Sequence, residues 1–125
     1  EFIEYVDGQA ASHAHAMQTA EKIKNTTALP SYPTRKLATL IEEIAPDRID
    51  LMKFDVEGAE EMIIPQMADV VARYRPKIAM SVYHATRHLW EMPRDLIAMC
   101  EDYDFYFGSY SMTRYESIFY CLPRS

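Results

Sequence analysis

The strongest constraint on the fold is an alternation of helical and extended patterns that begins at residue 34. In three segments, apolar residues recur every three or four positions, which is the spacing of helices that bury one face. Short runs rich in apolar and aromatic residues separate these segments and predict strands. The expected strands are 49–54, 78–84, 105–110 and 116–122. The resulting order is typical of an α/β layered sheet with right-handed crossovers.

Capping residues and prolines predict where the helices begin. Thr34 is suited to cap the first helix. Gly58 is expected to open the second helix, and Pro65 to interrupt it and then lie near the first turn of a restarted helix. Pro93 is expected to open the third helix, which leaves Trp90 in the loop before it.

The strands differ in their expected places in the sheet. Segment 49–54 carries apolar residues at both alternating sets of positions, which predicts an interior strand of a parallel sheet. Segments 105–110 and 116–122 are joined by only five residues, so we expect them to form an antiparallel pair. Near the amino terminus, 2–6 predicts a short strand, whereas 7–33 has no clear period. We therefore divide the chain into 1–33, whose structure the pattern does not determine, and an α/β unit at 34–125.

Acidic residues follow one of the predicted strands directly. "MKFDVEGAEE" places Asp55, Glu57 and Glu60 just after an apolar run, and His84 ends the next strand. In open α/β sheets, ligands bind beyond the carboxyl ends of the strands, so Asp55 and His84 are expected to face one crevice. Two simpler explanations stay open. In one, Asp55 is only a helix cap. In the other, Glu57 and Glu60 only interact favourably with the positive end of a helix, where Glu57 would accept backbone N–H groups.

Composition excludes some classes of function. The formal charge is −6, so no basic surface indicates nucleic-acid binding. No apolar run approaches the roughly 18 residues of a membrane span. The chain has only two cysteines, Cys100 and Cys121, which indicates a reducing compartment and a cytoplasmic location.

The motifs together resemble the FkbM family of S-adenosylmethionine-dependent methyltransferases. The most specific feature is "IDLMKFDVEGAE", because that family has a strand ending in Asp-Val-Glu-Gly-Ala-Glu. The segments "TRKLATLIEEI", "RPKIAMSVYH", "LWEMPRDLIAMCEDYDFYFGSYS" and "YESIFYCLPR" agree with it in order. The resemblance covers about residues 30 to 124. It implies a Rossmann-like sheet in which 49–54 and 78–83 are the fourth and fifth strands. The terminal antiparallel hairpin, 105–122, then supplies the sixth and seventh strands, with the final strand between the fifth and the sixth.

One part of the family pattern is missing. The family's first strand and its Gly-rich loop hold the methionine and ribose parts of the cofactor, and its second strand ends in an acid that binds the ribose. This chain has three glycines and no G-x-G. The resemblance therefore implies the carboxyl-terminal half of a methyltransferase, with the cofactor bound only if the other half is supplied. We expect the open side of 49–54 to pair with another chain, either a second copy or the missing half.

The expected site residues follow from the resemblance and from side-chain chemistry. Asp55, Glu57 and His84 are the catalytic candidates, because a hydroxyl acceptor benefits from a nearby base and histidine titrates near neutrality. Asp55 and Val56 are expected to contact the cofactor. The candidates for acceptor binding are Tyr83, His88 and Trp90.

No dedicated metal site is expected, and two alternatives remain for the ionisable groups. The carboxylates with His84 form an oxygen-rich set that suits Mg²⁺. His84 and His88, four apart, would suit zinc if both lay on one helix face.

Three functions remain in competition. The first is methyl transfer to oxygen on a sugar or another polar small molecule, with this chain carrying the acceptor side of the site. The second is an inert methyltransferase-like interaction domain, which the missing Gly-rich loop favours. The third is a metal-dependent hydrolase that uses the carboxylates and histidines.

Overall fold

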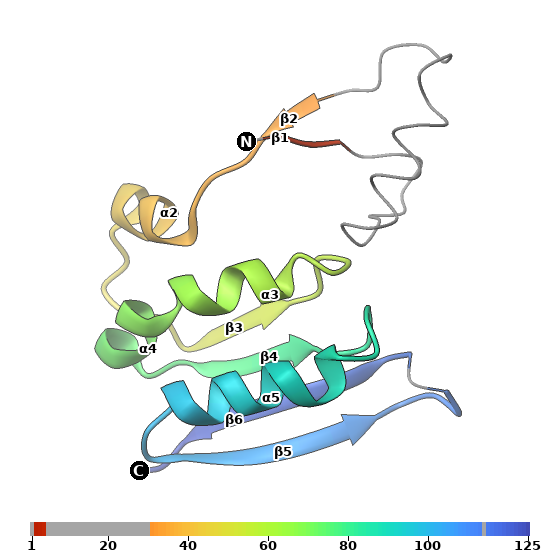
Figure 1. The fold of residues 1–125 in the computed structure, drawn as a ribbon. Helices are drawn as coiled ribbons and strands as arrows, with labels where there is room; N and C mark the ends of the chain where they lie inside the picture. Colours follow the sequence, from red (N-terminus) through yellow and green to blue (C-terminus); the bar gives the residue numbers. More distant parts are fainter. Residues whose placement is uncertain (1, 5–30, 114) are drawn as a thin grey trace, which may run out of the picture.

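The computed structural model describes residues 2–4, 31–113 and 115–125 (Figure 1). Strands β1 (Phe2–Glu4) and β2 (Ser31–Pro33) pair antiparallel in a small sheet of their own. The predicted strand 2–6 is thus found in part, and its last two residues lie outside the described ones. So do His13 and His15.

A second, four-stranded sheet carries most of the fold. Its strands are β3 (Leu51–Phe54), β4 (Lys77–Ser81), β5 (Tyr103–Ser109) and β6 (Ser117–Pro123). Their order is β3-β4-β6-β5, with β3 and β4 parallel and the other two pairs antiparallel. The last strand therefore lies between β4 and β5, which confirms the predicted α/β sheet with its antiparallel hairpin.

The helical segments are α2 (Leu37–Ile44), α3 (Glu60–Ile63), the 3₁₀ turn η1 (Ile64–Gln66), α4 (Ala68–Tyr74) and α5 (His88–Met99). All except α2 cover one face of this sheet, whereas α2, which has no buried residue, lies beyond the β3 edge (Figure 1). Figure 1 shows α3 and α5 lying side by side over the strands. The core between them contains Met67 from the end of η1, Ile78 and Met80 from β4, and Met92 and Leu96 from α5. Alternate residues of each strand point into this layer, as the twofold repeat of a strand requires.

The opposite face of the sheet carries apolar and aromatic side chains in contact with solvent. Leu51 of β3 is 61% exposed and Tyr106 of β5 is 55% exposed. The prediction that 49–54 is an interior strand is wrong within the described structure, because β3 lies at the edge of the sheet. Its apolar residues alternate between a covered and an uncovered side, with Met52 buried and Leu51 exposed.

The first helix begins later than its capping residue predicts. The N-cap position of α2 is Lys36, not Thr34, and its side chain makes no capping hydrogen bond. Instead, the Leu37 N–H donates to Oε1 of Gln66 at 3.0 Å. The free N–H group at the start of a helix is usually capped by a nearby side chain. Here a side chain distant in the sequence accepts it instead.

The last helix begins earlier than predicted. Helix α5 starts at His88, and Pro93 lies inside it, so Trp90 is helical and not in a loop. Proline in a helix interior costs roughly 3 kcal/mol, because it removes one hydrogen bond and crowds the preceding turn. Burial of Met92 and Leu96 on the inner face of α5 offsets this cost. The other proline prediction is confirmed, since Pro65 lies in η1 and separates α3 from α4.

Both cysteines are buried free thiols. No helix in the described part of the chain is long and apolar enough to cross a membrane.

Two neighbouring residues of α5 test the assignment of its buried face. Leu96 is fully buried, whereas Ile97 is 50% exposed. We expect Leu96→Ala to lower the free energy of unfolding by about 2–5 kcal/mol, because it leaves a cavity in the core. Ile97→Ala should change it by less than about 1 kcal/mol. Urea denaturation followed by circular dichroism measures both, and equal losses would contradict the assignment.

Candidate functional site

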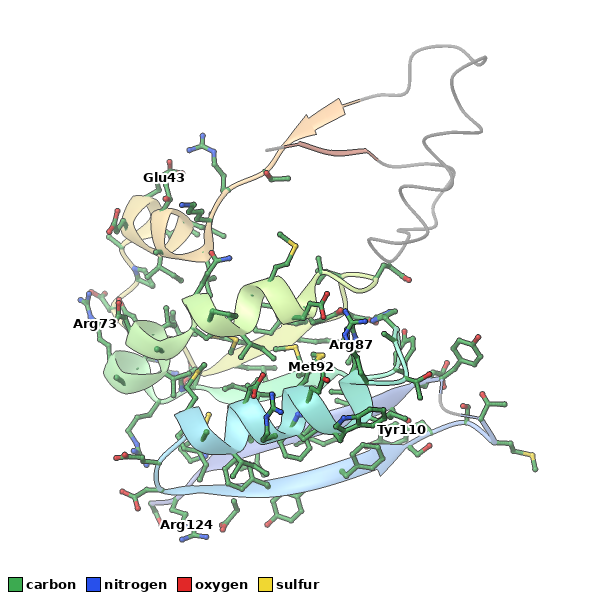
Figure 2. The ribbon with its side chains drawn as sticks, viewed as in Figure 1. Glu43, Arg73, Arg87, Met92, Tyr110 and Arg124 are labelled. Carbon is green, nitrogen blue, oxygen red and sulfur yellow. The ribbon has the colours of Figure 1, made fainter. Side chains whose placement is uncertain are left out.

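The parallel pair β3 and β4 brings two loops to the same edge of the sheet. Phe54 is opposite Met80 in the register, so the residues that follow each strand leave at the same level. Asp55 follows β3, and Tyr83 and His84 follow β4 after one buried residue, Val82. Figure 2 shows Arg87, at the start of α5, beside this edge. The predicted meeting of Asp55 and His84 is therefore found.

The loop between β3 and α3 folds around a buried carboxylate. Glu57 and Gly58 both have positive φ, at 56° and 103°, so the chain turns sharply there. A φ near 100° is readily adopted only by glycine. The carboxylate of Glu60 lies under the turn, fully buried, and accepts the N–H groups of Val56 at 2.7 Å and Gly58 at 2.8 Å. Sequence reasoning considered Glu57 for this task, but the structure gives it to Glu60.

His84 lies between Glu60 and two further carboxylates. Its Nδ1 is 3.0 Å from Oε1 of Glu60, and its Nε2 is 3.6 Å from Oδ1 of Asp55 and 3.5 Å from Oε2 of Glu57. The side chain is only 7% exposed. Neither ring nitrogen makes a well-aligned hydrogen bond with the described residues, so these contacts are electrostatic. We call Asp55, Glu57, Glu60 and His84 the carboxylate–histidine cluster.

The charges within this cluster stabilise one another. Burial alone would raise the pKa of Glu60, but contact with His84 and the hydrogen bond from Val56 outweigh it and lower that pKa below its usual value. Burial alone would lower the pKa of His84. The carboxylate of Glu60, followed by those of Glu57 and Asp55, outweighs that effect and raises the pKa. The cluster therefore favours a cation at the position of the His84 ring.

Asp55 follows β3 directly, and its side chain is partly exposed. The Tyr83 hydroxyl donates to its Oδ1 at 3.1 Å, and Lys53 lies 3.5 Å from its other oxygen. Burial alone would raise the pKa of Asp55, but hydrogen bonds from Ser81 and Tyr83 and the charge of Lys53 lower it. Burial, followed by the charge of Asp55, raises the pKa of Tyr83 to about 12, so the phenol stays a donor.

The three residues predicted to bind the acceptor lie in different surroundings. The Tyr83 ring lies against that of His84, with 4.1 Å between centroids and a tilt of 39°, which places it in the site. Trp90 is exposed on α5. His88 is almost fully buried, with Nε2 3.3 Å from Glu61, which in turn pairs with Arg87 at 2.6 Å. Acceptor contacts by Tyr83, His88 and Trp90 all remain predictions.

Two residues that contribute to the site were not predicted from the sequence. Glu60 was given only a helix-end role, although it is the buried centre of the cluster. Ser81, buried at the end of β4, acts on Asp55 through a hydrogen bond. The only sequence signal for Glu60 was its position two residues after Gly58, where a side chain can reach back to the turn.

Asp55 and Val56 are the two residues predicted to contact the cofactor. Both residues border the open end of β3, and the Val56 side chain is partly exposed. The Val56 N–H is already bonded to Glu60, and its carbonyl accepts the N–H of Ala59 at 3.2 Å. The Val56 backbone is therefore engaged within the loop, which leaves its side chain to face a group beyond the strand. Contact of Asp55 and Val56 with a cofactor remains a prediction.

The sequence of this chain matches a known protein family. The model of the methyltransferase FkbM domain matches residues 4–107, which include the whole cluster. The chain belongs to the FkbM methyltransferase family.

A solved structure shares the fold of this FkbM chain. It is the crystal structure of methyltransferase FkbM from Methylobacillus flagellatus KT, with a TM-score of 0.61 and 17% sequence identity. The match covers 90% of this chain but only 36% of that one, so the chain spans about a third of its length. A comparison with curated proteins gives no match.

The buried role of Glu60 can be tested against its neighbour. Glu60→Gln should lower the free energy of unfolding by about 2 kcal/mol or more, because hydrogen bonds to a buried charge are lost. Amide hydrogen exchange at Val56 and Gly58 should also accelerate. Glu61→Gln removes a partly exposed carboxylate that pairs with Arg87, so we expect a loss of about 1 kcal/mol or less and unchanged exchange at both amides. Similar behaviour of the two variants would show that Glu60 does not organise the loop.

Proposed function

We propose that this chain forms the acceptor side of an S-adenosylmethionine-dependent O-methyltransferase acting on a sugar or another polar small molecule. The observation that carries the proposal is the carboxylate–histidine cluster at the carboxyl ends of β3 and β4, within the segment that matches the FkbM family. Open α/β sheets bind their ligands at this edge. A hydroxyl acceptor is favoured over carbon because the cluster offers groups that orient a hydroxyl and take up its proton.

The proposed reaction assigns separate tasks to these residues. S-adenosylmethionine supplies an electrophilic methyl group and leaves as the neutral sulfide. The acceptor hydroxyl donates to Asp55, which Tyr83 holds in place at 3.1 Å. As the oxygen–carbon bond forms and the sulfur–carbon bond breaks, the hydroxyl proton passes into the cluster of Asp55, Glu57 and His84. The rate gain comes from positioning the oxygen and stabilising its developing charge.

We further propose that the open edge of β3 receives another strand of a methyltransferase sheet. An edge strand presents unpaired N–H and C=O groups that favour pairing with added chain. The exposed Leu51 on this strand and the 36% share of the M. flagellatus structure support this proposal. The added strand is also where the rest of the cofactor site is expected.

Calorimetric titration with S-adenosylhomocysteine tests cofactor binding. The 125-residue chain and a longer polypeptide that adds methyltransferase-domain sequence before Glu1 are titrated in parallel. We expect saturable one-to-one binding by the longer polypeptide and at least tenfold weaker binding by the short chain, because Asp55 and Val56 supply only one border of the site. If neither binds, an inert interaction domain becomes the better explanation.

Two aspartates at opposite ends of β3 test the acceptor side. Asp55→Asn should reduce methyl transfer by about 100-fold or more, because it removes the carboxylate that orients the hydroxyl. Asp50→Asn, which affects only an exposed pair with Arg48, should change transfer less than twofold. The assay uses methyl-labelled S-adenosylmethionine and a panel of sugars with the cofactor-binding form of the protein.

The same variants separate catalysis from folding. Both should change the free energy of unfolding by less than about 1 kcal/mol, because both side chains are at least partly exposed. Normal transfer by Asp55→Asn would remove Asp55 from the mechanism.

A further inference from the structure

Three carboxylates surround a single buried imidazole in the carboxylate–histidine cluster, and their charge is not balanced. Even with His84 protonated, three carboxylates against one imidazolium leave two negative charges. Lys53 is the cation paired with Asp55, but its side chain is 60% exposed and 3.5 Å away, so water screens most of its effect. The remaining negative charge of the cluster therefore favours binding of a divalent cation.

Near the second buried histidine, His88, the carboxylate charge is compensated by an arginine. His88 also has Nε2 against a carboxylate, that of Glu61 at 3.3 Å. There, Arg87 lies 2.6 Å from the same carboxylate and supplies the compensating charge. No arginine contacts the carboxylates of Asp55, Glu57 or Glu60 among the residues that the structure describes.

The distances around His84 Nε2 are too long for hydrogen bonds. The oxygens of Asp55 and Glu57 lie 3.6 and 3.5 Å away, beyond the usual limit of about 3.2 Å. Two ligands bound to one metal ion at about 2.1 Å lie roughly 3.0–3.4 Å apart, so each oxygen is only slightly farther from Nε2 than a second ligand of the same ion would be. The ligand atoms that all lie within 4.8 Å of one another belong to Asp55, Glu60 and His84, so Glu57 would have to move toward Asp55 to share an ion.

His84 provides an observation independent of the acids. Its ring is more than nine-tenths buried, and Nε2 faces Asp55 and Glu57 without a well-aligned partner in the described part of the chain. On the other side of the ring, Nδ1 faces Glu60 at 3.0 Å. Metal-binding histidines characteristically direct their second nitrogen at a carboxylate, which fixes the ring and strengthens the ligand.

We propose that Asp55, Glu57 and Nε2 of His84 bind a divalent first-row metal ion, with Glu60 as the supporting carboxylate. One imidazole nitrogen with carboxylate oxygens suits Mn²⁺ or Zn²⁺ better than the all-oxygen preference of Mg²⁺. The role of the ion rests on the proposed function. In the metal-bound form, Asp55, Glu57 and His84 would hold the ion, which would act as a Lewis acid on the acceptor hydroxyl. The hydroxyl proton would then pass to water and not into the cluster.

Calorimetric titration of the chelator-treated chain with MnCl₂, ZnCl₂ and MgCl₂ tests the site without cofactor or acceptor. We expect one-to-one binding of Mn²⁺ or Zn²⁺ at least tenfold tighter than that of Mg²⁺. Glu57→Gln should weaken it at least tenfold, and Glu60→Gln should weaken it by about 10–100-fold, as loss of a supporting carboxylate does. The matched control Glu61→Gln, beside the balanced His88, should stay within twofold.

Each outcome decides the proposal. Glu57 is partly exposed, so its variant is expected to fold, and circular dichroism checks this. Absence of saturable binding by the unchanged chain at millimolar metal overturns the site. Binding that Glu57→Gln leaves intact also overturns it, and would place the metal elsewhere, for example on His13 and His15. Because no methyl donor is present, failure here leaves the S-adenosylhomocysteine result unaffected.

Discussion

The site depends on one buried carboxylate. Glu60 accepts two N–H groups from the loop after β3 and lies against the histidine that follows β4, so a single side chain connects the ends of two strands. A buried carboxylate without such partners would be strongly destabilising, and with them it is held ionised. Its burial also aligns the loop so that Asp55 and Glu57 both approach the same imidazole. The acid that is least exposed thus determines the arrangement of the two that can meet a ligand.

The sheet explains why these residues meet. A parallel pair must be joined by a crossover, and α3, η1 and α4 provide it on one face. The two strands then end at one edge, with loops of different kinds beyond them. The loop after β3 contributes acids, and the loop after β4 contributes Tyr83 and His84. This division gives a site in which charge comes from one loop and the ring and phenol come from the other.

Much of this arrangement could be predicted from sequence because its signals are local and periodic. The alternation of patterns predicts the sheet, and the positions of Asp55 and His84 at strand ends predict their proximity. Glu60 could not be assigned in this way, because its burial depends on a turn with positive φ at Glu57 and Gly58. The start of α5 was missed for a related reason. Pro93 is a strong local signal for a helix start, but the burial of Met92 and Leu96 outweighs it.

The order of the strands has a consequence for how the sheet is assembled. β6 comes after every other described strand in the sequence, yet it lies between β4 and β5. β4 therefore has no partner on that side until the chain has passed through α5 and β5 and returned. Such non-local pairing slows folding, because the loop must close before the contacts form. Loss of the segment from residue 117 onwards would split the sheet at its centre, leaving the parallel pair that bears the cluster detached from β5.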